Sequence, residues 1–351
     1  MRRSRCCYGV STSWGDVEAF CNGLAKGEAL ALLHPLDISF PHPYLATMQF
    51  SRSFADEALG FTIPSRHARG RLVRLGAALD DVLSAHAYPP PIEKLVAEAQ
   101  VLASLLGALL KDDAGQLTLQ AQTEQGAVSL LVADYKAGAV RGYAKYDADK
   151  LAELGEDPTL FGLFGKGYLA ITFDQAVSGE RYQGIVPLEG TGLGAAAEHY
   201  FAQSEQVPSL VHIAVRHDPG EGCVGAGMLL QHLPEGEIGR ERLHVRHDHP
   251  HWEHVMIMGR TLSDPELTDT TLPLSSIAWR LFHEEEEVRA FDPVQISKGC
   301  RCDPVHIHDV LSRFGADERR DMADERGIIS VDCAFCSKIF DVGLDQFSTQ
   351  N

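Results

Sequence analysis

Basic residues are scarce in this sequence. Lysine and arginine together number 31, against 49 aspartates and glutamates, and the formal net charge is −18. Surfaces that bind nucleic acid depend on clustered Lys and Arg side chains that contact phosphates. The charge therefore argues against a nucleic-acid partner, and it also disfavours binding to acidic membrane surfaces.

Long apolar runs are missing as well. A membrane-spanning helix needs about 20 consecutive apolar residues, and the best run here, Val101 to Leu110, has the length of a core helix. No apolar segment follows Arg2, Arg3 and Arg5 in the manner of a secretion signal. Eight cysteines in 351 residues, four of them at metal-ligand spacing, suit a reducing cytosol better than a secreted disulfide framework. The sequence predicts a cytoplasmic protein without a membrane partner.

The larger part of the chain, residues 56–234, has the pattern of an α+β domain. Hydrophobic residues make up 44% of the chain, which excludes wholesale disorder and leaves room for two or three domains. Short strands are separated by turn residues such as Ala137-Gly138 and Ser178-Gly179, and strands joined in this way pair antiparallel. Strands are predicted at 71–75, 117–120, 128–135, 140–146, 168–173, 182–188, 209–215 and 225–231, and helices at 77–86, 92–110 and 194–203.

One glycine-rich stretch in this domain permits a different interpretation. The sequence from Gly190 to Ala195 formally fits the dinucleotide-binding fingerprint, with Asp218 at the end of the next predicted strand. That fingerprint requires a parallel strand-helix-strand unit, whereas the preceding strands are joined by short turns. A glycine-rich entry into a helix is favoured, and an NAD(P)-dependent oxidoreductase is the less favoured alternative.

Residues 235–294 are predicted to form a partly helical linker. Its first part carries five histidines among acids and arginines: His244, His247, His249, His251 and His254. Clustered histidines can bind metal, and Asp248 and Glu253 could assist. Because the histidines lack regular helical or strand spacing, we expect a solvated loop, and a metal site at 244–254 stays an open alternative.

The second part of the linker shows a helical stripe. Its apolar residues are Leu274, Ile277, Ala278, Leu281 and Phe282, and the acidic run 284–287 follows them. Residues at this spacing fall on one side of a helix. The stripe predicts a helix that packs on the first domain.

The pattern that organises the chain lies near its end. Cys300 and Cys302 form one close pair, and Cys333 and Cys336 form another after thirty intervening residues. Four thiolates at about 2.3 Å complete a tetrahedral Zn²⁺ site and leave no position for water or substrate. One structural zinc per chain is therefore expected in the reduced protein. Four unrelated buried cysteines are the alternative.

The same sulfurs could respond to an oxidant. Sulfurs around zinc lie roughly 3.8 Å apart and a disulfide needs about 2.05 Å, so the easiest pairs are Cys300 with Cys302 and Cys333 with Cys336. Such bonds close very short loops and cannot replace a metal that joins both ends of a long segment. Structural zinc contributes on the order of 10–16 kcal/mol, while whole domains are stable by only about 5–15 kcal/mol. Oxidation that displaces the metal is expected to unfold the module.

The cysteines frame a small module, predicted to span 295–345. Asp303-Pro304 has the signature of a helix start, with a helix expected to about Phe314 and a second one over 317–324. A strand over 328–331 leads to the second cysteine pair, and 339–340 returns. His306 and His308 are left out of the ligand set because four sulfurs already satisfy tetrahedral zinc.

These features resemble the heat shock protein 33 family, the redox-regulated bacterial holdase chaperones. The Cys-X-Cys and Cys-X-X-Cys pairs at the end of an acidic chain carry the resemblance, which extends from about Phe61 to Phe340. Upstream segments agree with it: RGRLVRL at 69–75, SLLVADY at 129–135, YFAQSEQ at 200–206, GMLLQ at 227–231 and RLFHEE at 280–285.

The resemblance implies an ATP-independent chaperone rather than an enzyme, with unfolding client proteins as its partners. Zinc would be bound while the four cysteines are reduced, and the linker would lie on the first domain. A strong oxidant such as hypochlorite would produce the Cys300–Cys302 and Cys333–Cys336 disulfides, release zinc and unfold the linker. The family also implies a monomer when reduced and a dimer when oxidised. A constitutive zinc-dependent interaction module, whose cysteines do not cycle, is the alternative.

Two parts of the chain receive no role from the resemblance. Residues 1–55 are expected to be an extension, with Met48 as an alternative start, since family members generally begin near Phe61. Their cysteines are incidental thiols. Cys223 lies in an apolar, glycine-containing strand and is expected to be a small core residue.

Overall fold

The computed structural model describes residues 54–110, 113–123, 125–155, 157–175, 179–218, 222–233 and 249–347. The expectations for residues 1–53, and for His244, His247 and Asp248, lie outside these ranges. Within them, no helix has the length and apolar character needed to cross a membrane. The described chain has an α+β fold, as predicted, with two six-stranded sheets and a separate hairpin.

The first sheet combines strands from distant parts of the chain. Its order is β10-β1-β2-β9-β8, β11 also pairs with β1, and all of its pairs are antiparallel. The strands are β1 (Glu57–Ile63), β2 (Ala68–Leu75), β8 (Ser209–Asp218), β9 (Gly222–His232), β10 (Arg289–Ala290) and β11 (Val294–Gln295), and the turn η1 (Pro64–Arg66) joins β1 to β2.

The second sheet has the order β12-β5-β4-β3-β6-β7, and only its β12–β5 pair is parallel. Its strands are β3 (Gln116–Gln122), β4 (Val128–Lys136), β5 (Ala139–Tyr146), β6 (Tyr168–Gln175), β7 (Glu180–Pro187) and β12 (Ser297–Lys298). Ala137 and Gly138, the pair predicted to turn between β4 and β5, both have positive φ (50° and 77°). Two consecutive residues in this region make the tight turn that matches the twist of a hairpin.

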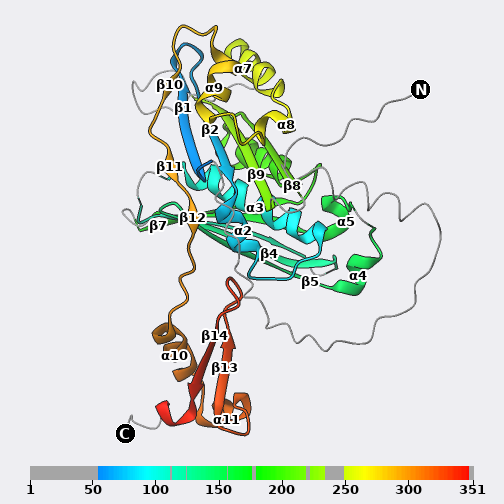
Figure 1. Ribbon diagram of the computed structural model, residues 1–351, viewed down its shortest axis with the longest axis vertical. Helices are drawn as coiled ribbons and strands as arrows, with labels where there is room; N and C mark the ends of the chain where they lie inside the picture. The colour runs from blue at the N-terminus through cyan, green and yellow to red at the C-terminus, as the bar shows by residue number, and fades with distance from the viewer. Residues whose placement is uncertain are drawn as a thin grey trace, which may run out of the picture. The chain divides into compact units, whose positions relative to one another are not determined.

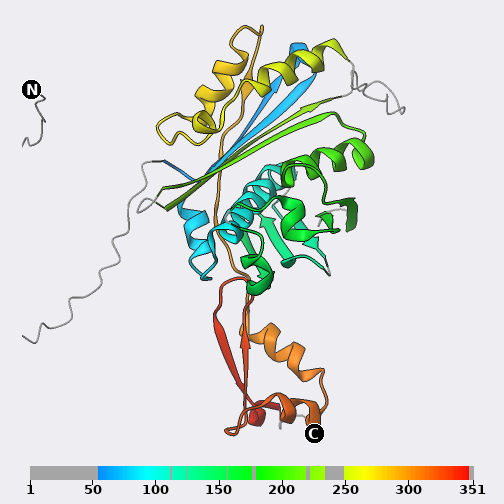
Figure 2. The ribbon, with the colours of Figure 1, turned by 90° about the vertical axis from the view of Figure 1, so that its right-hand side faces the viewer.

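A layer of helices separates the two sheets (Figure 2). Its helices are α2 (Ala77–Leu83), α3 (Pro90–Gly107) and α6 (Leu193–Tyr200), which continues as η2 (Phe201–Glu205), while α4 (Ala148–Ala152) and α5 (Leu160–Phe164) lie beside the second sheet. Helix α3 starts at the predicted proline cluster and is buried on almost every side, because it contacts strands of both sheets. This explains why its sequence is apolar on most faces.

A second helical layer covers the opposite face of the first sheet (Figure 2). It consists of α7 (Pro250–Arg260), α8 (Asp264–Leu267) and α9 (Leu274–Phe282). All five residues of the predicted stripe are buried in α9 and form a core with β1 and β2. The expectation of a loop was wrong for residues 250–260. Trp252 and Val255 are buried one helical turn apart, and the histidines around them obscured that spacing.

Residues 289–299, called the strap here, connect this helical layer to the C-terminal module. The strap runs along the edge of the first sheet as β10 and β11 and then reaches the second sheet as β12 (Figure 1). From the aligned pair Phe61↔Ala290 to the pair Ala58↔Val294, the strap runs four positions while β1 runs three. The strap therefore has one extra residue in this interval, at Asp292-Pro293. Side chains 289–295 are all exposed, whereas Ile296 is buried.

The C-terminal module is small. It contains α10 (Pro304–Ser312), α11 (Ala316–Met322), the antiparallel pair β13 (Ile328–Asp332) and β14 (Ile339–Gly343), and η3 (Leu344–Phe347). Asp303 caps α10 as predicted, since its carboxylate accepts a hydrogen bond from the N–H of Val305 at 3.0 Å. Leu311, Ile329 and Val342 form its buried core. A core of three buried apolar side chains stabilises a fold only weakly, so the folding of this module depends on further interactions.

Candidate metal centre

Two loops of the C-terminal module present the four cysteines. Cys300 and Cys302 follow the strap directly, immediately before the cap of α10. Cys333 follows β13 and begins a tight turn, in which its carbonyl accepts hydrogen bonds from the N–H groups of Cys336 (3.2 Å) and Ser337 (2.8 Å). Ser337 has a φ of 55°, which closes the turn. The second pair of thiols is therefore held on one short, well-bonded turn.

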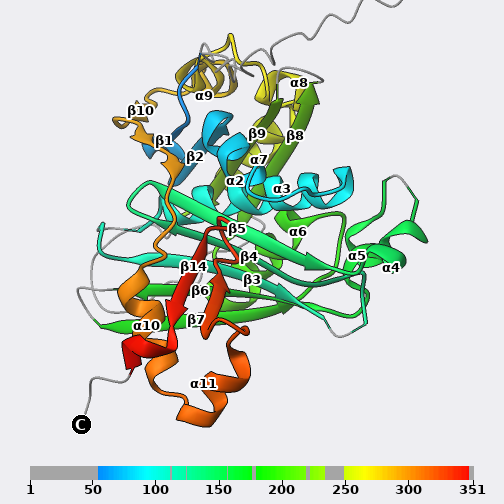
Figure 3. The same cartoon turned by 60° about the horizontal axis from the view of Figure 1, so that its bottom comes forward.

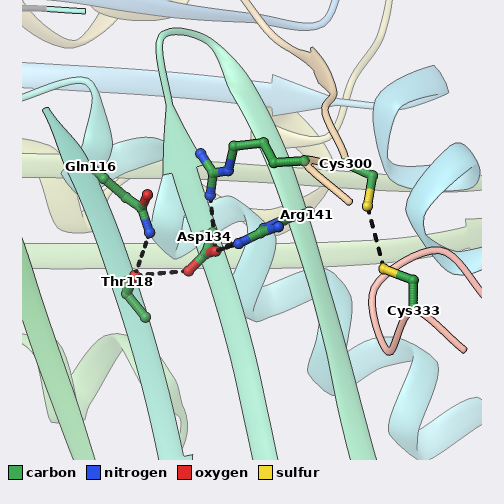
Figure 4. A network of polar contacts seen from close by, with 7 residues as sticks. Gln116, Thr118, Asp134, Arg141, Cys300 and Cys333 are labelled. Atoms are coloured by element: carbon green, nitrogen blue, oxygen red, sulfur yellow. Dashed lines mark hydrogen bonds and ion pairs between the residues drawn. The ribbon is translucent and has the colours of Figure 1, made fainter. Parts of the chain in front are cut away.

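The four predicted residues lie together. Their sulfur atoms are all within 4.8 Å of one another. The Sγ atoms of Cys300 and Cys333 are 3.5 Å apart (Figure 4), and those of Cys302 and Cys336 are 3.6 Å apart. Among the residues that the structure describes, no other group of three or more potential ligands is this compact, and neither His306 nor His308 belongs to it.

This donor set fits a metal ion. Sulfurs that surround a tetrahedral ion at about 2.3 Å are roughly 3.8 Å apart, close to the observed separations. Each cysteine is partly buried, so the sulfurs are partly screened from water. The cluster joins residues on either side of the α10–α11 segment, and a bound ion would tie both ends of that segment together.

The ionisation of these thiols also favours a cation. Burial raises the pKa of the Cys300 thiol, but the N–H of Cys302 and the neighbouring thiols offset this and hold it at about 7. Burial and the neighbouring sulfurs raise the pKa of Cys302 to about 12, and burial likewise raises that of Cys333. One thiolate thus makes a second one costly. A cation between the sulfurs removes that obstacle, because it stabilises each negative charge.

The residue between the first two thiols contacts the second sheet. Arg301 places its Nη2 3.0 Å from Oδ2 of Asp134 in β4. The same carboxylate, which is 3% exposed, pairs with Arg141 of β5 at 2.7 Å and accepts a hydrogen bond from Thr118 of β3 at 2.8 Å. Figure 4 shows Thr118 and Arg141 on either side of the Asp134 carboxylate. The loop that supplies two thiols is therefore anchored on a buried carboxylate of β4.

The turn that carries the other two thiols also contacts this sheet (Figure 3). The Arg141 guanidinium lies 3.9 Å from the centroid of the Phe335 ring, and the Tyr143 ring meets Phe335 edge-on with 5.0 Å between centroids. The Ser337 hydroxyl donates to the carbonyl of Ala85 at 2.7 Å. We call the contacts of Arg301, Phe335 and Ser337 with β4, β5 and the α2–α3 connection the docking contacts. The sequence did not reveal them, because their partners lie more than a hundred residues away.

Two other sequence candidates lie away from this centre. Cys223 is buried in β9, where its N–H donates to the Asp80 carboxylate at 2.9 Å, so it is a core residue as predicted. The Gly190 stretch leads into α6, between β7 of the second sheet and β8 of the first. Because those strands belong to different sheets, no parallel unit surrounds the fingerprint, as expected.

Residues 56–342 match the family model described as Hsp33 protein. The chain is 38% identical over 292 residues to the 33 kDa chaperonin of Caulobacter vibrioides, with 81% of this chain and 94% of that protein covered. It is 35% identical over 282 residues to the 33 kDa chaperonin of Yersinia pestis, with 80% and 90% covered. The fold is similar to the crystal structure of the 33 kDa chaperonin (heat shock protein 33 homolog) of Thermotoga maritima, with a TM-score of 0.66, 20% identity, and 83% and 96% covered.

Proposed function

This chain belongs to the Hsp33 family, and we propose that it is an ATP-independent holdase chaperone switched on by oxidation of its four clustered cysteines. Family membership supports a chaperone function, with unfolding proteins as clients and no enzymatic activity. The observation that carries the switch is the sulfur cluster itself. It joins two loops across thirty residues, and each loop also makes docking contacts with the first domain.

In the resting state, Cys300, Cys302, Cys333 and Cys336 hold one Zn²⁺ as thiolates. The all-sulfur set supports zinc, which such sites bind in closed tetrahedral geometry. Residues 295–345 then form the redox module, 235–294 the linker and 56–234 the chaperone core. A reducing cytoplasm, where thiols persist, suits this state.

Oxidation removes the ligands. Each disulfide forms as two thiolates give up two electrons to an oxidant such as hypochlorite, which takes up water and is reduced to chloride and two hydroxide ions. With Cys300–Cys302 and Cys333–Cys336 bonds in place, no thiolate of the cluster would remain to bind a metal ion, and a bound Zn²⁺ would be lost. The new bonds close only short loops, so the module's small core cannot hold it folded.

The signal reaches the core through the docking contacts. Arg301 lies inside one disulfide loop and Phe335 inside the other, so closing these loops changes both contacts at once. Once the module detaches, the strap loses its C-terminal attachment and the linker helices loosen. The apolar face under α9 then becomes available to clients, a population shift driven by the lost metal-binding energy. Dimerisation on activation is part of the proposal on family grounds.

The deciding experiment compares reduced and oxidised protein in an aggregation assay with a chemically unfolded client, while a zinc-sensitive dye follows the metal. We expect suppression of light scattering only after oxidation, together with release of one zinc per chain. Equal suppression in both states would favour a constitutive zinc-dependent module instead. A thermal shift on adding NAD(P)H would support the oxidoreductase alternative.

A further inference from the structure

The outer edge of β1 is covered by the strap. The N–H of Phe291 donates to the carbonyl of Gly60 at 2.8 Å, and the N–H of Ile296 donates to the carbonyl of Asp56 at 2.8 Å. In between, Ala58 is aligned with Val294. The strap therefore occupies this edge as an extended segment that pairs through its main chain.

The strap's side chains contribute little to this pairing. Residues 289–295 are exposed, including Phe291 at 52%. Ile296 is the one buried side chain of the strap. An edge strand held by main-chain hydrogen bonds and a single apolar anchor has low local stability. Its attachment is also independent of most of its sequence, so another extended chain could make the same hydrogen bonds.

At the other described sheet edges, parts of the fold outside the strap contact β8, β7 and the later part of β5, whereas β12 of the strap pairs with the first two residues of β5, Ala139 and Val140. The Glu198 carboxylate of α6 accepts from the N–H of Val211 on β8 at 2.7 Å, and the Tyr88 hydroxyl accepts from the N–H of Ala144 on β5 at 2.9 Å. Strand β7 carries an exposed Arg181 and ends at Pro187, and charge and proline both discourage strand addition. Strand β1 differs from β7 and β8 because its cover is the strap, and it differs from β5 because the strap is aligned with it at four positions rather than two.

We propose that release of the strap opens the edge of β1 as a docking site for an extended segment of an unfolded polypeptide, which adds to the first sheet as a new strand. This inference rests on the proposed function, because oxidation supplies the release. Main-chain pairing suits a partner of unspecified sequence, since every unfolded chain carries the same N–H and C=O groups. Leu59, Phe61 and Ile63 point alternate apolar side chains to the face under α9, where side chains of the bound segment would find contacts.

A covalent lock on the strap tests the site. Glu57 and Gln295 are directly opposed and flank the hydrogen-bonded position Asp56–Ile296, so they form a non-hydrogen-bonded pair in which side chains approach closely. The double variant Glu57→Cys/Gln295→Cys is bridged by oxidised glutathione while zinc is bound, and bridging is checked by mass spectrometry. After hypochlorite treatment we expect normal zinc release and at least about a fivefold loss of aggregation suppression. Each single variant is the control and should behave like wild type.

The outcomes separate the two proposals. Full suppression by the bridged protein, with the bridge intact and zinc released, would overturn the edge site and leave the redox switch standing. If oxidised wild type itself fails to suppress aggregation, that result contradicts the proposed function, whatever the bridged variant does.

A photo-crosslinker gives a second, direct readout. Benzoylphenylalanine at Glu57 should crosslink to an unfolded client several-fold more after oxidation than before. The same group at Arg181 on β7 is the matched control and should show no increase. Equal crosslinking from both positions would contradict a specific site on β1.

Discussion

Arg301, which lies between Cys300 and Cys302, places its Nη2 3.0 Å from Oδ2 of Asp134 in the second sheet. A candidate metal-ligand loop and the second sheet are thus joined by a direct ion pair. Asp134 also pairs with Arg141, whose guanidinium lies over the Phe335 ring. Both thiol loops therefore contact the same polar network of the second sheet. A movement of either thiol loop would therefore change contacts of this network.

We expect Arg301→Gln to loosen the docking of the module without releasing its metal. Asp134 keeps Arg141 and Thr118 as partners, so no buried carboxylate is orphaned. A hydrogen bond to a charged group contributes about 1.5–3 kcal/mol, and partial exposure of Arg301 reduces this to about 1 kcal/mol, or about fivefold in the docking equilibrium. Hydrogen exchange at 333–337 should accelerate by that factor. Arg320→Gln, which removes a pair within α11, is the control, and unchanged exchange in Arg301→Gln would refute a docking role.

The reduced protein should carry one zinc per chain, and Cys300→Ser or Cys336→Ser should weaken zinc binding by at least about 10–100-fold. That range is typical for losing a group that merely supports a metal ligand, and a ligand itself should matter more. Competition with a metallochromic chelator measures the affinity. Wild-type zinc retention in either variant would remove that residue from the site.

Cys223→Ala should leave oxidative activation intact. The thiol is buried in β9 and is not one of the four clustered sulfurs. A small loss of stability, on the order of 1 kcal/mol, is expected from removing a buried atom. Chemical denaturation measures that loss and an aggregation assay measures activation; a stable but non-activatable variant would show that the set of redox thiols is incomplete.

The kind of disulfide should matter more than the number of bonds. In Cys302→Ser/Cys336→Ser only Cys300 and Cys333 remain, with their sulfurs 3.5 Å apart, and oxidation would close a loop across 33 positions. Such a bond restrains the unfolded state by roughly 3–4 kcal/mol on the chain-entropy model. We therefore expect this variant to become less active on oxidation, which inverts the normal response.

Its matched control is Cys333→Ser/Cys336→Ser, in which oxidation can join only the neighbours Cys300 and Cys302. That short loop should leave the module unfolded and activity unchanged. Light scattering reports activity and hydrogen exchange across 303–332 reports folding. High activity together with a protected module would mean that unfolding is not the switch.

Acid should weaken the attachment of the linker through Glu285. This side chain follows α9, is 5% exposed, and lies 2.8 Å from Arg66 and 2.9 Å from His254. Burial alone would raise the pKa of Glu285, but Arg66 and Ser65 lower it below its usual range. A lowered pKa in the folded state means that the carboxylate stabilises the fold above its unfolded pKa, about 4.3. That stability is lost as the pH falls through the folded value.

Glu285→Gln should therefore lower the melting temperature at pH 7, and the difference from wild type should shrink below about pH 4. Thermal unfolding across this pH range is the measurement. Glu287→Gln, whose exposed partner Arg289 is two residues away, is the control and should have little effect. A difference in melting temperature between Glu285→Gln and wild type that stays the same at all pH values would show that the charge of Glu285 does not stabilise the attachment of this segment.

Features with a local or periodic signal were predictable from the sequence. The spacing of Cys300, Cys302, Cys333 and Cys336 predicted their cluster, and the stripe from Leu274 to Phe282 predicted the buried face of α9. The role of these cysteines as zinc ligands stays a prediction. Contacts between distant residues left no such signal.

Arg301 and Asp134 are 167 positions apart, and nothing near either residue marks it as the partner of the other. Helix α7 was missed because its histidines dominate the composition, while the buried spacing of Trp252 and Val255 spans only one turn. The pairing of the strap with β1 was equally hidden. Two-residue strands with exposed side chains have no alternation of polar and apolar residues to read.

The break in the strap at Asp292-Pro293 bears on the background activity of the resting protein. It divides the cover of β1 into two short pieces, β10 and β11, that differ in register by one residue. Because a proline has no N–H, neither piece can support the other across the break. We therefore expect each piece to detach from β1 with its own equilibrium constant. If the strap controls client binding as proposed, the piece that detaches more readily would set the basal activity of the reduced protein. On that proposal, the break at Asp292-Pro293 would affect the ratio of oxidised to basal activity rather than the maximum activity.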